Sequence, residues 1–585
     1  MHNFLTTKWG RYFSPSETNI LIFMAIVVGA GTGFGAMIFI TLIEYARELF
    51  FGYSADVLSN ALGAAEGGYN WWVMLIPAAG GLLGGPIIFY FAKEAKGHGV
   101  PEVMDAVARR GGIIRPQVAA IKALASAICI GSGGSAGREG PIIQIGSAIG
   151  STIGQIFRMS GNRVKILVGC GAAAGISAVF NAPIAGILFS LEVILGDFAI
   201  KTFAPVLISS VLASVITRSF LGNHPAFEVP AYELVSALEI PLYVALGVVC
   251  GGVAVAFTRT LGWAEDFFDN LKIPETVKPA IGGMLLGVIG IFFPQVFADG
   301  YNTIDLALYG RMTFGLMFIL IVLKVAATSM TLGSGNSGGI FAPSLFMGAM
   351  VGGAFGSLVH SNFPAFTGTT GAYALVGMAA LVGGTTHAPL TAILIIFEMT
   401  GDYRIILPLM VSVTFSTLVA RHLFEHSIYT IKLVSRGVFL KGGKDLAVLR
   451  SMQVYEVMDR NFETISPSTS LSRIIRKVES TRESYYMVVD DDQHLHGILS
   501  FQDIRGYMSK NELQDLIIAE DIAHTNIITL LPGDNLDMAR EKFALQDVQL
   551  IPVVESAENK RIIAVLRRTE MMTVYNKRLI ETLNN

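Results

Sequence analysis

A glycine-rich cluster that ends in proline occurs twice in this chain. Residues 131–141 have the sequence GSGGSAGREGP, and residues 333–343 have the sequence GSGNSGGIFAP. A second pair follows in the same order, because NAPIAGILFSLE at residues 181–192 resembles HAPLTAILIIFE at residues 387–398. Both pairs keep nearly the same separation. The chain therefore contains two copies of one unit, and each copy has a glycine-rich interruption.

Long apolar runs surround both clusters. Hydrophobic residues make up 52% of the 585 residues and charged residues only 15%, whereas a soluble protein carries about a quarter charged residues. The clearest runs cover residues 20–42, 71–91, 241–257, 314–327 and 405–420. Several approach the ~20 residues that a helix needs to cross a bilayer, and others are short and broken by Gly or Pro. We therefore predict an all-α polytopic membrane bundle with many incomplete spans.

The repeat places a binding site between the two copies. We expect the membrane part to cover residues 18–440, with repeats at about 18–220 and 235–435. In transporter folds built from two such units, the site lies near the midplane between the ends of broken helices. The spacing alone leaves open whether the second copy runs in the opposite direction. The alternative explanation is that the glycines only allow close helix packing.

Glycine-rich loops that enter helices favour anions. The first N–H groups of a helix are free, and the helix dipole adds partial positive charge at that end. Pro141 and Pro343 suit the first helical turn, where a backbone N–H is not needed. Two such ends that face each other would bind a negative ion through several weak contacts, so that the ion can enter and also leave.

Glu139 is an acidic residue inside the first cluster and in an apolar segment. Ionisable residues are rare in such surroundings and are usually functional. As a carboxylate, Glu139 can occupy the place of the anion, and when protonated it can swing away. We therefore predict that Glu139 gates the anion path. The alternative is a structural glutamate that pairs with Arg138.

Other features exclude several classes of protein. We expect the polar and aromatic N-terminal segment, residues 1–17, not to be a cleavable signal peptide, and Lys8 and Arg11 favour a cytoplasmic start. Cys129, Cys170 and Cys250 all lie in apolar runs, so neither a disulfide framework nor a metal site is expected. No basic stripe indicates a nucleic-acid partner.

Several motifs resemble those of the CLC family of chloride channels and transporters. Residues 137–141 (GREGP) resemble the family's gate motif, residues 339–343 (GIFAP) its GxFxP motif, and residues 97–102 (GHGVPE) its GSGIPE motif. Tyr429 falls at the position of the pore tyrosine, and Lys122 at a buried basic position. The resemblance implies inverted repeats, chloride as the transported ion, no required cofactor and a homodimer in the lipid bilayer. The anion-binding residues that it implies are His98, Gly137, Arg138, Gly339, Ile340, Phe341 and Tyr429.

The chain departs from the family pattern at two positions. His98 replaces the usual serine, and its imidazole could donate to an anion in a pH-dependent way or lie in a solvated loop. Val193, next to Glu192, stands where proton-coupled members commonly have an internal glutamate, so a proton path through Glu192 and Val193 is doubtful. Since valine carries no proton, we predict passive chloride conduction gated by Glu139. The alternative is chloride/proton antiport.

After Lys432 the pattern changes to short β-rich stretches that alternate with amphipathic helices. Residues 484–490 and 495–499 are predicted strands, and residues 470–479 a predicted helix. A second copy follows, because residues 464–467 (TISP) pair with residues 529–532 (TLLP). The segment resembles tandem CBS modules at residues 441–510 and 515–580, a regulatory α/β domain that lies in the cytoplasm in this family.

The first CBS copy offers a candidate adenine-nucleotide site. In residues 497–503 (GILSFQD), Ser500 could reach a phosphate and Asp503 could accept a hydrogen bond from a ribose. The second copy departs from this pattern, since it has Ala564, Arg567 and Glu570 at the matching places. A dimerisation module without a ligand is the equal alternative.

Two further alternatives compete with anion transport. His422, Glu425 and His426 have the H-x-x-E-H spacing of a zinc protease, but they lie at the polar end of an apolar run and lack a third ligand. A magnesium channel needs carboxylates along its path, and the membrane part offers few beyond Glu139, Glu192 and Glu398. We therefore expect no enzyme and no bound metal. We expect a multi-pass protein of the cell inner or plasma membrane with both termini in the cytoplasm.

Overall fold

Most of the chain before residue 436 is helical, as the apolar runs predict. The computed structural model describes residues 17–52, 71–222, 235–435 and 451–584, the last range with short gaps at 482, 508–514, 526, 547 and 557, together with the single residues 227, 229, 232 and 449. The predicted N-terminal segment lies outside the described residues except for Glu17. Chain contacts divide the molecule into two units, Met1–Arg436 and Gly437–Asn585.

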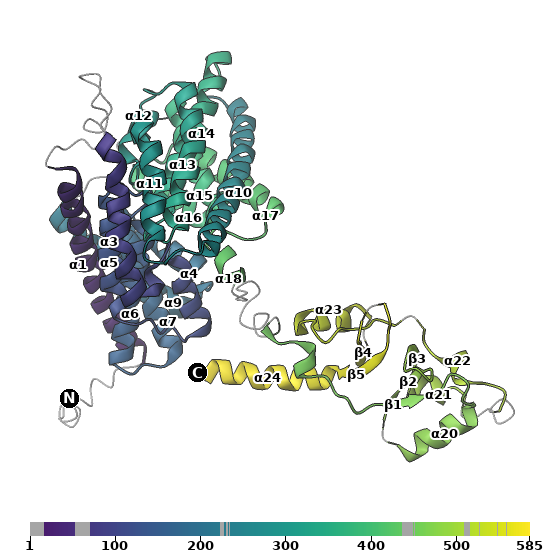
Figure 1. Ribbon diagram of the computed structural model, residues 1–585. Coiled ribbons are helices and arrows are strands. Elements are labelled where there is room, and N and C mark those ends of the chain that lie inside the picture. The colour runs from purple at the N-terminus through teal and green to yellow at the C-terminus, as the bar shows by residue number, and fades with distance from the viewer. Residues whose placement is uncertain are drawn as a thin grey trace, which may run out of the picture. The chain divides into compact units, whose positions relative to one another are not determined.

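The first half of the membrane unit contains helices of very different length (Figure 1). They are α1 Glu17–Phe51, η2 Trp71–Met74, α3 Leu75–Phe91, η3 Lys93–Ala95, α4 Val100–Arg109, α5 Gln117–Gly131, α6 Glu139–Ile156, α7 Gly161–Phe180, α8 Pro183–Phe189, the π-helical turn η4 Ser190–Leu195 and α9 Ile200–Leu221.

The second half repeats this order (Figure 1). Its elements are η5 Ala237–Glu239, α10 Ile240–Asn270, α11 Lys278–Phe292, η6 Pro294–Val296, α12 Tyr301–Leu308, α13 Phe314–Gly333, α14 Phe341–Asn362, α15 Thr370–Thr386, α16 Pro389–Thr400 and α17 Ile406–Leu423. The short helix α18 Ile431–Ser435 follows and ends the membrane unit.

Packing within the two halves follows one pattern. Helix α6 packs on α7 as α14 packs on α15, and α1 packs on α9 as α10 packs on α17. The halves meet where α3 contacts α11 and where α8 contacts α16. Each half therefore forms the same bundle, and equivalent elements of the two halves contact each other. Such reciprocal contacts fit the inverted relation that the family resemblance implies.

Equivalent turns end equivalent helices. Asn181 after α7 and His387 after α15 both adopt the left-handed conformation, with φ of 57° and 58°. Non-glycine residues rarely do so, and asparagine is among those that tolerate it best. Pro183 and Pro389 then occupy the first turn of α8 and α16, where a backbone N–H is dispensable. The repeated sequence thus produces the same helix break twice.

Eight helices of the described residues are long and apolar enough to cross a membrane. The helices α8 and α16, of 7 and 12 residues, are too short to do so, as expected for interrupted spans. The long helices α7 and α14 are mostly buried, whereas α1, α10 and α17 expose many apolar side chains. A lipid-facing surface explains that exposure. The molecule is an integral membrane protein with several spans.

The C-terminal unit is an α/β domain built from two copies. The first copy has a three-stranded sheet in the order β1-β2-β3, and the second has β4 paired with β5. Its elements are η7 Val454–Glu456, β1 Glu463–Ile465, α20 Leu471–Ser480, β2 Tyr485–Val489, β3 Leu495–Ser500, α21 Phe501–Arg505, α22 Ala519–Ile522, α23 Leu536–Gln546, β4 Leu550–Val554, β5 Ile562–Arg567 and α24 Arg568–Asn584. The predicted helix and both predicted strands are confirmed to within one or two residues.

Apolar residues from both copies form one shared core. Met487 and Val489 on β2 pack with Leu550 on β4 and with Val565 on β5. Each copy also contains an equivalent lysine hydrogen bond. Lys477 donates to the Thr464 carbonyl and Lys542 to the Thr529 carbonyl, both at 2.8 Å. The two copies therefore stabilise each other and were correctly paired from the sequence.

Candidate anion site

The two glycine-rich clusters meet in the middle of the membrane unit. The Gly137 N–H donates to the Gly339 carbonyl at 2.8 Å, and the Gly339 N–H donates back to the Gly137 carbonyl at 2.6 Å. This antiparallel bridge lies just before the first residues of α6 and α14. Two helix N-termini from opposite halves of the chain are thereby fixed side by side.

The two backbones can come this close only because the glycines at the contact have no side chains. A Cβ atom on Gly339 would lie 2.7 Å from the Gly140 nitrogen, and one on Gly140 would overlap the His98 carbonyl. Gly99 adopts φ of 84°, a conformation that other residues rarely take, and immediately precedes α4. The backbone at residues 97–99 therefore comes directly against the start of α6.

Glu139 is the first residue of α6, and only 1% of its surface is exposed. Its Oε1 accepts a hydrogen bond from the Tyr301 hydroxyl at 2.7 Å. Its Oε2 is buried against Gly137 and lacks a hydrogen-bond partner within the described part of the chain. The Arg138 guanidinium lies 5.4 Å from the centre of the Tyr301 ring. One carboxyl oxygen is thus held by the opposite half, and the other points into the space between the clusters.

Buried aromatic rings line the same region. The rings of His98 and Tyr429 are 5.9 Å apart, and those of Tyr429 and Phe189 are 6.2 Å apart. Phe341, the first residue of α14, lies 5.5 Å from Phe180. The fold therefore gathers His98, Gly137, Glu139, Gly339, Ile340, Phe341 and Tyr429 into one buried region.

The chemistry of this region favours a partly dehydrated anion. Ile340 precedes α14 and Phe341 begins it, so the first N–H groups of this helix have no acceptor inside the helix. The dipoles of α6 and α14 add partial positive charge at the bridge. A carboxylate from Glu139 and a small anion are both suited to such a site, and they would compete for it.

Two fully buried lysines hold the loops around this region in place. The Lys122 ammonium donates to the carbonyls of Ala95 at 3.0 Å and Gly97 at 2.7 Å. Lys324 does the same in the second half, to Val296 and Ala298, both at 3.0 Å. Lys122 thereby fixes the loop that carries His98, and Lys324 fixes the loop that precedes Tyr301.

Glu192 lies away from this region, at the contact of α8 and α16. Its carboxylate accepts hydrogen bonds from the Thr391 N–H at 2.9 Å and the Thr391 hydroxyl at 2.7 Å. In return, Glu398 accepts from the Ala185 N–H at 2.7 Å. Glu192 of the first half thus caps the start of α16, and Glu398 of the second half caps the start of α8. Glu192 and Val193 sit on a π-helical turn, for which the second half has a regular helix.

Ser500 and Asp503 lie in the C-terminal unit and contact each other. The Asp503 carboxylate accepts from the Ser500 hydroxyl at 2.6 Å and approaches His524 Nε2 at 3.1 Å. Partial burial raises the pKa of Asp503, but the hydrogen bonds from Ser500 and His524 outweigh it and leave the pKa below its usual value. Gly497 faces Ala523, since a Cβ there would lie 2.6 Å from the alanine methyl group. In this conformation the groups predicted to contact a nucleotide bind one another.

The zinc-protease alternative is wrong. Helix α17 ends at Leu423, so His422 is in its last turn whereas Glu425 and His426 follow the helix. The H-x-x-E-H spacing therefore does not place both histidines on one helical face. Among the residues that the structure describes, no group of three or more His, Cys, Asp or Glu side chains is arranged to hold a metal ion.

Comparison with known proteins agrees with this architecture. The profile of the family described as "Voltage gated chloride channel" matches residues 80–421, and the CBS domain profile matches residues 454–510 and 519–577. The chain belongs to this chloride channel family, the CLC family. Since CLC proteins transport ions, the enzyme and magnesium-channel alternatives do not apply.

Named CLC relatives include both channels and exchangers. Chloride channel protein CLC-f of Arabidopsis thaliana is 30% identical over 83% of this chain and 71% of its own length. The H(+)/Cl(-) exchange transporter ClcA of Salmonella schwarzengrund is 32% identical over 70% of this chain and 87% of its own. The crystal structure of a slow cyanobacterial Cl-/H+ antiporter matches with a TM-score of 0.65 and 28% identity, over 71% of this chain and 97% of that one.

The sequence did not reveal two residues of the site. Lys324 had a detectable signal, because it lies nine residues before Gly333 as Lys122 lies nine residues before Gly131. Tyr301 had none, since nothing in the sequence around it indicates that α12 begins beside α6. Its contact with Glu139 depends on how the two halves pack.

Proposed function

We propose that this CLC protein exchanges chloride, or a related small anion, for protons, with Glu139 as the group that alternates between the two. The observation that carries this proposal is the buried Glu139 carboxyl at the bridge between α6 and α14. Ionised, it competes with the anion for the amide-rich helix ends. Protonated, it no longer competes, and it carries the proton in the opposite direction.

Coupled exchange replaces passive conduction as the preferred interpretation. The sequence favoured conduction because Val193 cannot carry a proton. The exchange transporter ClcA and the cyanobacterial antiporter, each similar over most of the membrane unit, support coupling instead. The buried position of Glu139 supports it as well, because a proton that reaches this carboxyl has already entered the anion path. The absence of an acid at position 193 then requires another entry point for protons.

The anion is proposed to contact the amides of Ile340 and Phe341 together with Tyr429 and the backbone around Gly137 and Gly339. His98 replaces the family's serine and presents an imidazole beside Tyr429, 5.9 Å between ring centres. The Arg138 side chain is directed toward Tyr301, so we assign it to holding the gate region rather than to anion contact.

Assembly and orientation belong to the same proposal. We propose a homodimer with one anion path per subunit, both termini in the cytoplasm of a cell inner or plasma membrane, and regulation by the CBS pair. The contact between Ser500 and Asp503 supports a ligand-free regulatory module. An adenine nucleotide would have to displace this hydrogen bond.

Flux measurement on proteoliposomes tests the proposal. Purified full-length chain is reconstituted, and chloride efflux and external pH are recorded together. An outward chloride gradient is expected to drive protons inward against their own gradient at a fixed ratio to chloride. Chloride efflux without uphill proton movement would establish passive conduction and contradict the proposal.

A further inference from the structure

A cavity of about 480 Å³ opens between the C-terminal part of α10 and the helix α18. Its lining includes Glu265 and Asp266 from α10 and Lys432 from α18. Helix α18 is the last element before the chain enters the C-terminal unit. The cavity therefore lies beside the last helix of the membrane unit.

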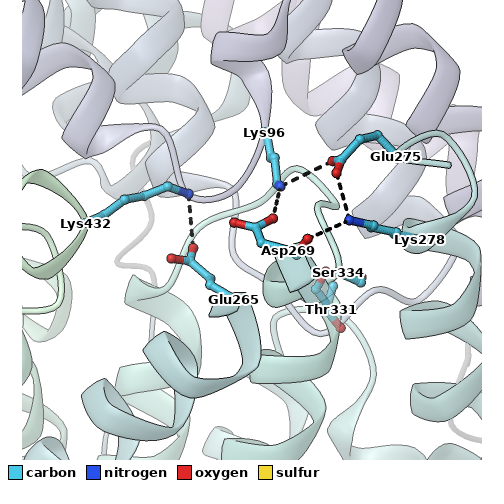
Figure 2. A network of polar contacts seen from close by, with 8 residues as sticks. All are labelled: Lys96, Glu265, Asp269, Glu275, Lys278, Thr331, Ser334 and Lys432. Atoms are coloured by element: carbon cyan, nitrogen blue, oxygen red, sulfur yellow. Dashed lines mark hydrogen bonds and ion pairs between the residues drawn. The ribbon is translucent and has the colours of Figure 1, made fainter. Parts of the chain in front are cut away.

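An ion pair forms one wall of this cavity. The Lys432 ammonium lies 3.2 Å from Glu265 Oε1, and the two side chains are only 16% and 14% exposed (Figure 2). Partly buried pairs of this kind are costly to desolvate and are weak evidence for a purely stabilising role. A carboxylate that can reach both a cavity and the protein interior is suited to proton transfer.

Neighbouring charges belong to a separate network. Lys96 binds Asp269 at 2.7 Å and approaches Glu275 at 3.6 Å, and Lys278 binds Glu275 at 2.7 Å (Figure 2). Figure 2 shows this group to one side and the pair of Glu265 and Lys432 to the other. Asp269 and Glu275 are thus engaged by two lysines that also fix the loop between α10 and α11.

Glu265 lies beside both motif regions of the site. A Cβ atom on Gly97 would be 3.9 Å from Glu265 Oε1 and 3.5 Å from the Lys432 ammonium. The Glu265 backbone nitrogen packs 3.1 Å from the Cβ position of Gly333, at the start of the second glycine-rich cluster. The carboxyl of Glu265 is therefore placed between the first and second halves of the chain.

The loop beside Glu265 leads directly to the gate. Gly97 is followed by His98, whose carbonyl contacts Gly140, the residue after Glu139. The backbone of His98 thus lies between Gly97, which is beside Glu265, and Gly140, and its imidazole lies 5.9 Å from the Tyr429 ring. The backbone of residues 97–98 therefore links the surroundings of Glu265 to those of Glu139.

We propose that Glu265 is the group that accepts protons at the cavity beside α18 and passes them toward Glu139, in place of an acid at position 193. The inference rests on the proposed exchange function. The Glu265 carboxylate takes a proton from hydronium in the cavity and releases water, and its attraction to Lys432 weakens. The proton then passes by way of His98 or water to the Glu139 carboxylate. No bond other than those to the proton is made or broken.

Charged groups on several elements lie in this part of the membrane unit. Helix α18 contributes Lys432 and α5 contributes Lys122, whose ammonium binds the Gly97 carbonyl. The remaining ones are Lys96 in the loop before α4 and Arg259, Asp266 and Asp269 on α10. The end of α13 contributes only backbone at Gly333.

Reconstituted full-length variants test this assignment by their separate chloride and proton fluxes. Glu265→Gln is expected to lower proton flux by at least about tenfold while chloride flux stays near that of the wild type. Glu265→Asp keeps the carboxyl and should restore most proton flux. Asp266→Asn, in the same cavity wall and more exposed, is the matched control and should leave both fluxes unchanged.

A double variant separates proton transfer from anchoring of α18. Glu265→Gln with Lys432→Gln removes both charges, so no unpaired lysine remains, and proton flux is still expected to be low. Recovery of proton flux in this double variant would overturn the proposal and leave Glu265 as an anchor only. Normal coupling in Glu265→Gln would overturn it as well. If the wild type itself moved no protons, the proposed exchange function would fail first, and this inference with it.

Discussion

The two halves of the membrane unit share a scaffold and differ in the groups at its centre. Lys122 and Lys324 each donate to two loop carbonyls, and Glu192 and Glu398 each cap a helix of the other half. The residues that are equivalent in the two halves hold the interrupted helices in place. They explain why the two glycine-rich helix starts lie side by side.

The positions that differ between the two halves supply the chemical groups of the anion site. The first cluster has Arg138 and Glu139 where the second has Ile340 and Phe341. One half thus supplies an ionisable gate and the other an apolar wall with free amides. Tyr301, from the second half, then holds the gate of the first. A duplicated scaffold becomes an asymmetric site because the two copies have diverged at these few positions.

Removing the acid from the first cluster should have the largest effect. Glu139→Gln makes both clusters unable to carry a proton, so proton flux is expected to fall to background while chloride still moves. Chloride flux should also lose its dependence on pH. The measurement is paired chloride and pH recording in proteoliposomes, with Glu192→Gln as a control that keeps Glu139. Proton flux that survives in Glu139→Gln would contradict the assignment of the gate.

The shared scaffold predicts equal effects in both halves. Lys122→Met and Lys324→Met each leave two buried carbonyls without a donor, which should cost about 2 kcal/mol of stability in each variant. Thermal unfolding of the purified protein in detergent provides the comparison. A loss confined to one variant would break the equivalence of the two halves.

The contact between the halves predicts a smaller, functional effect. Tyr301→Phe removes the hydroxyl that holds Glu139, and the loss of about 1.5 kcal/mol should raise chloride flux roughly tenfold. Tyr373→Phe is the matched control, because it removes a 2.9 Å bond to Glu239 elsewhere in the membrane unit. Unchanged flux in Tyr301→Phe would mean that this hydrogen bond does not restrain the gate.

The smallest expected effect concerns the CBS copies of the C-terminal unit. Since hydrogen bonds lower the pKa of Asp503, its ionised form stabilises the folded state above the usual pKa of aspartate, and this contribution is lost as the pH falls through the lowered value. Asp503→Asn should therefore lower local stability by about 1 kcal/mol at neutral pH and by less in acid. Hydrogen exchange of β3 and α21 in the full-length chain measures it. An equal deficit at acidic pH would exclude the ionised carboxyl as the cause.

The repeated scaffold could be predicted from the sequence because its signals are local. Glycine clusters, helix-starting prolines and apolar runs indicated the broken helices, and the CBS strands followed from their short β-rich pattern. The contact between Tyr301 and Glu139 could not be predicted, because it joins residues of different halves. The H-x-x-E-H spacing wrongly indicated a protease for a related reason. Helix α17 ends at Leu423, so the two histidines do not share one helix. Local sequence patterns predict helices and strands, whereas the packing of these elements determines which side chains come into contact.

Anomalous diffraction from crystals grown in bromide tests the central claim most directly. The account predicts a bromide peak at the start of α14, within contact of the Ile340 and Phe341 amides and beside Tyr429. A difference map without halide density between α6 and α14 would contradict the proposal that these paired helix starts form the anion site.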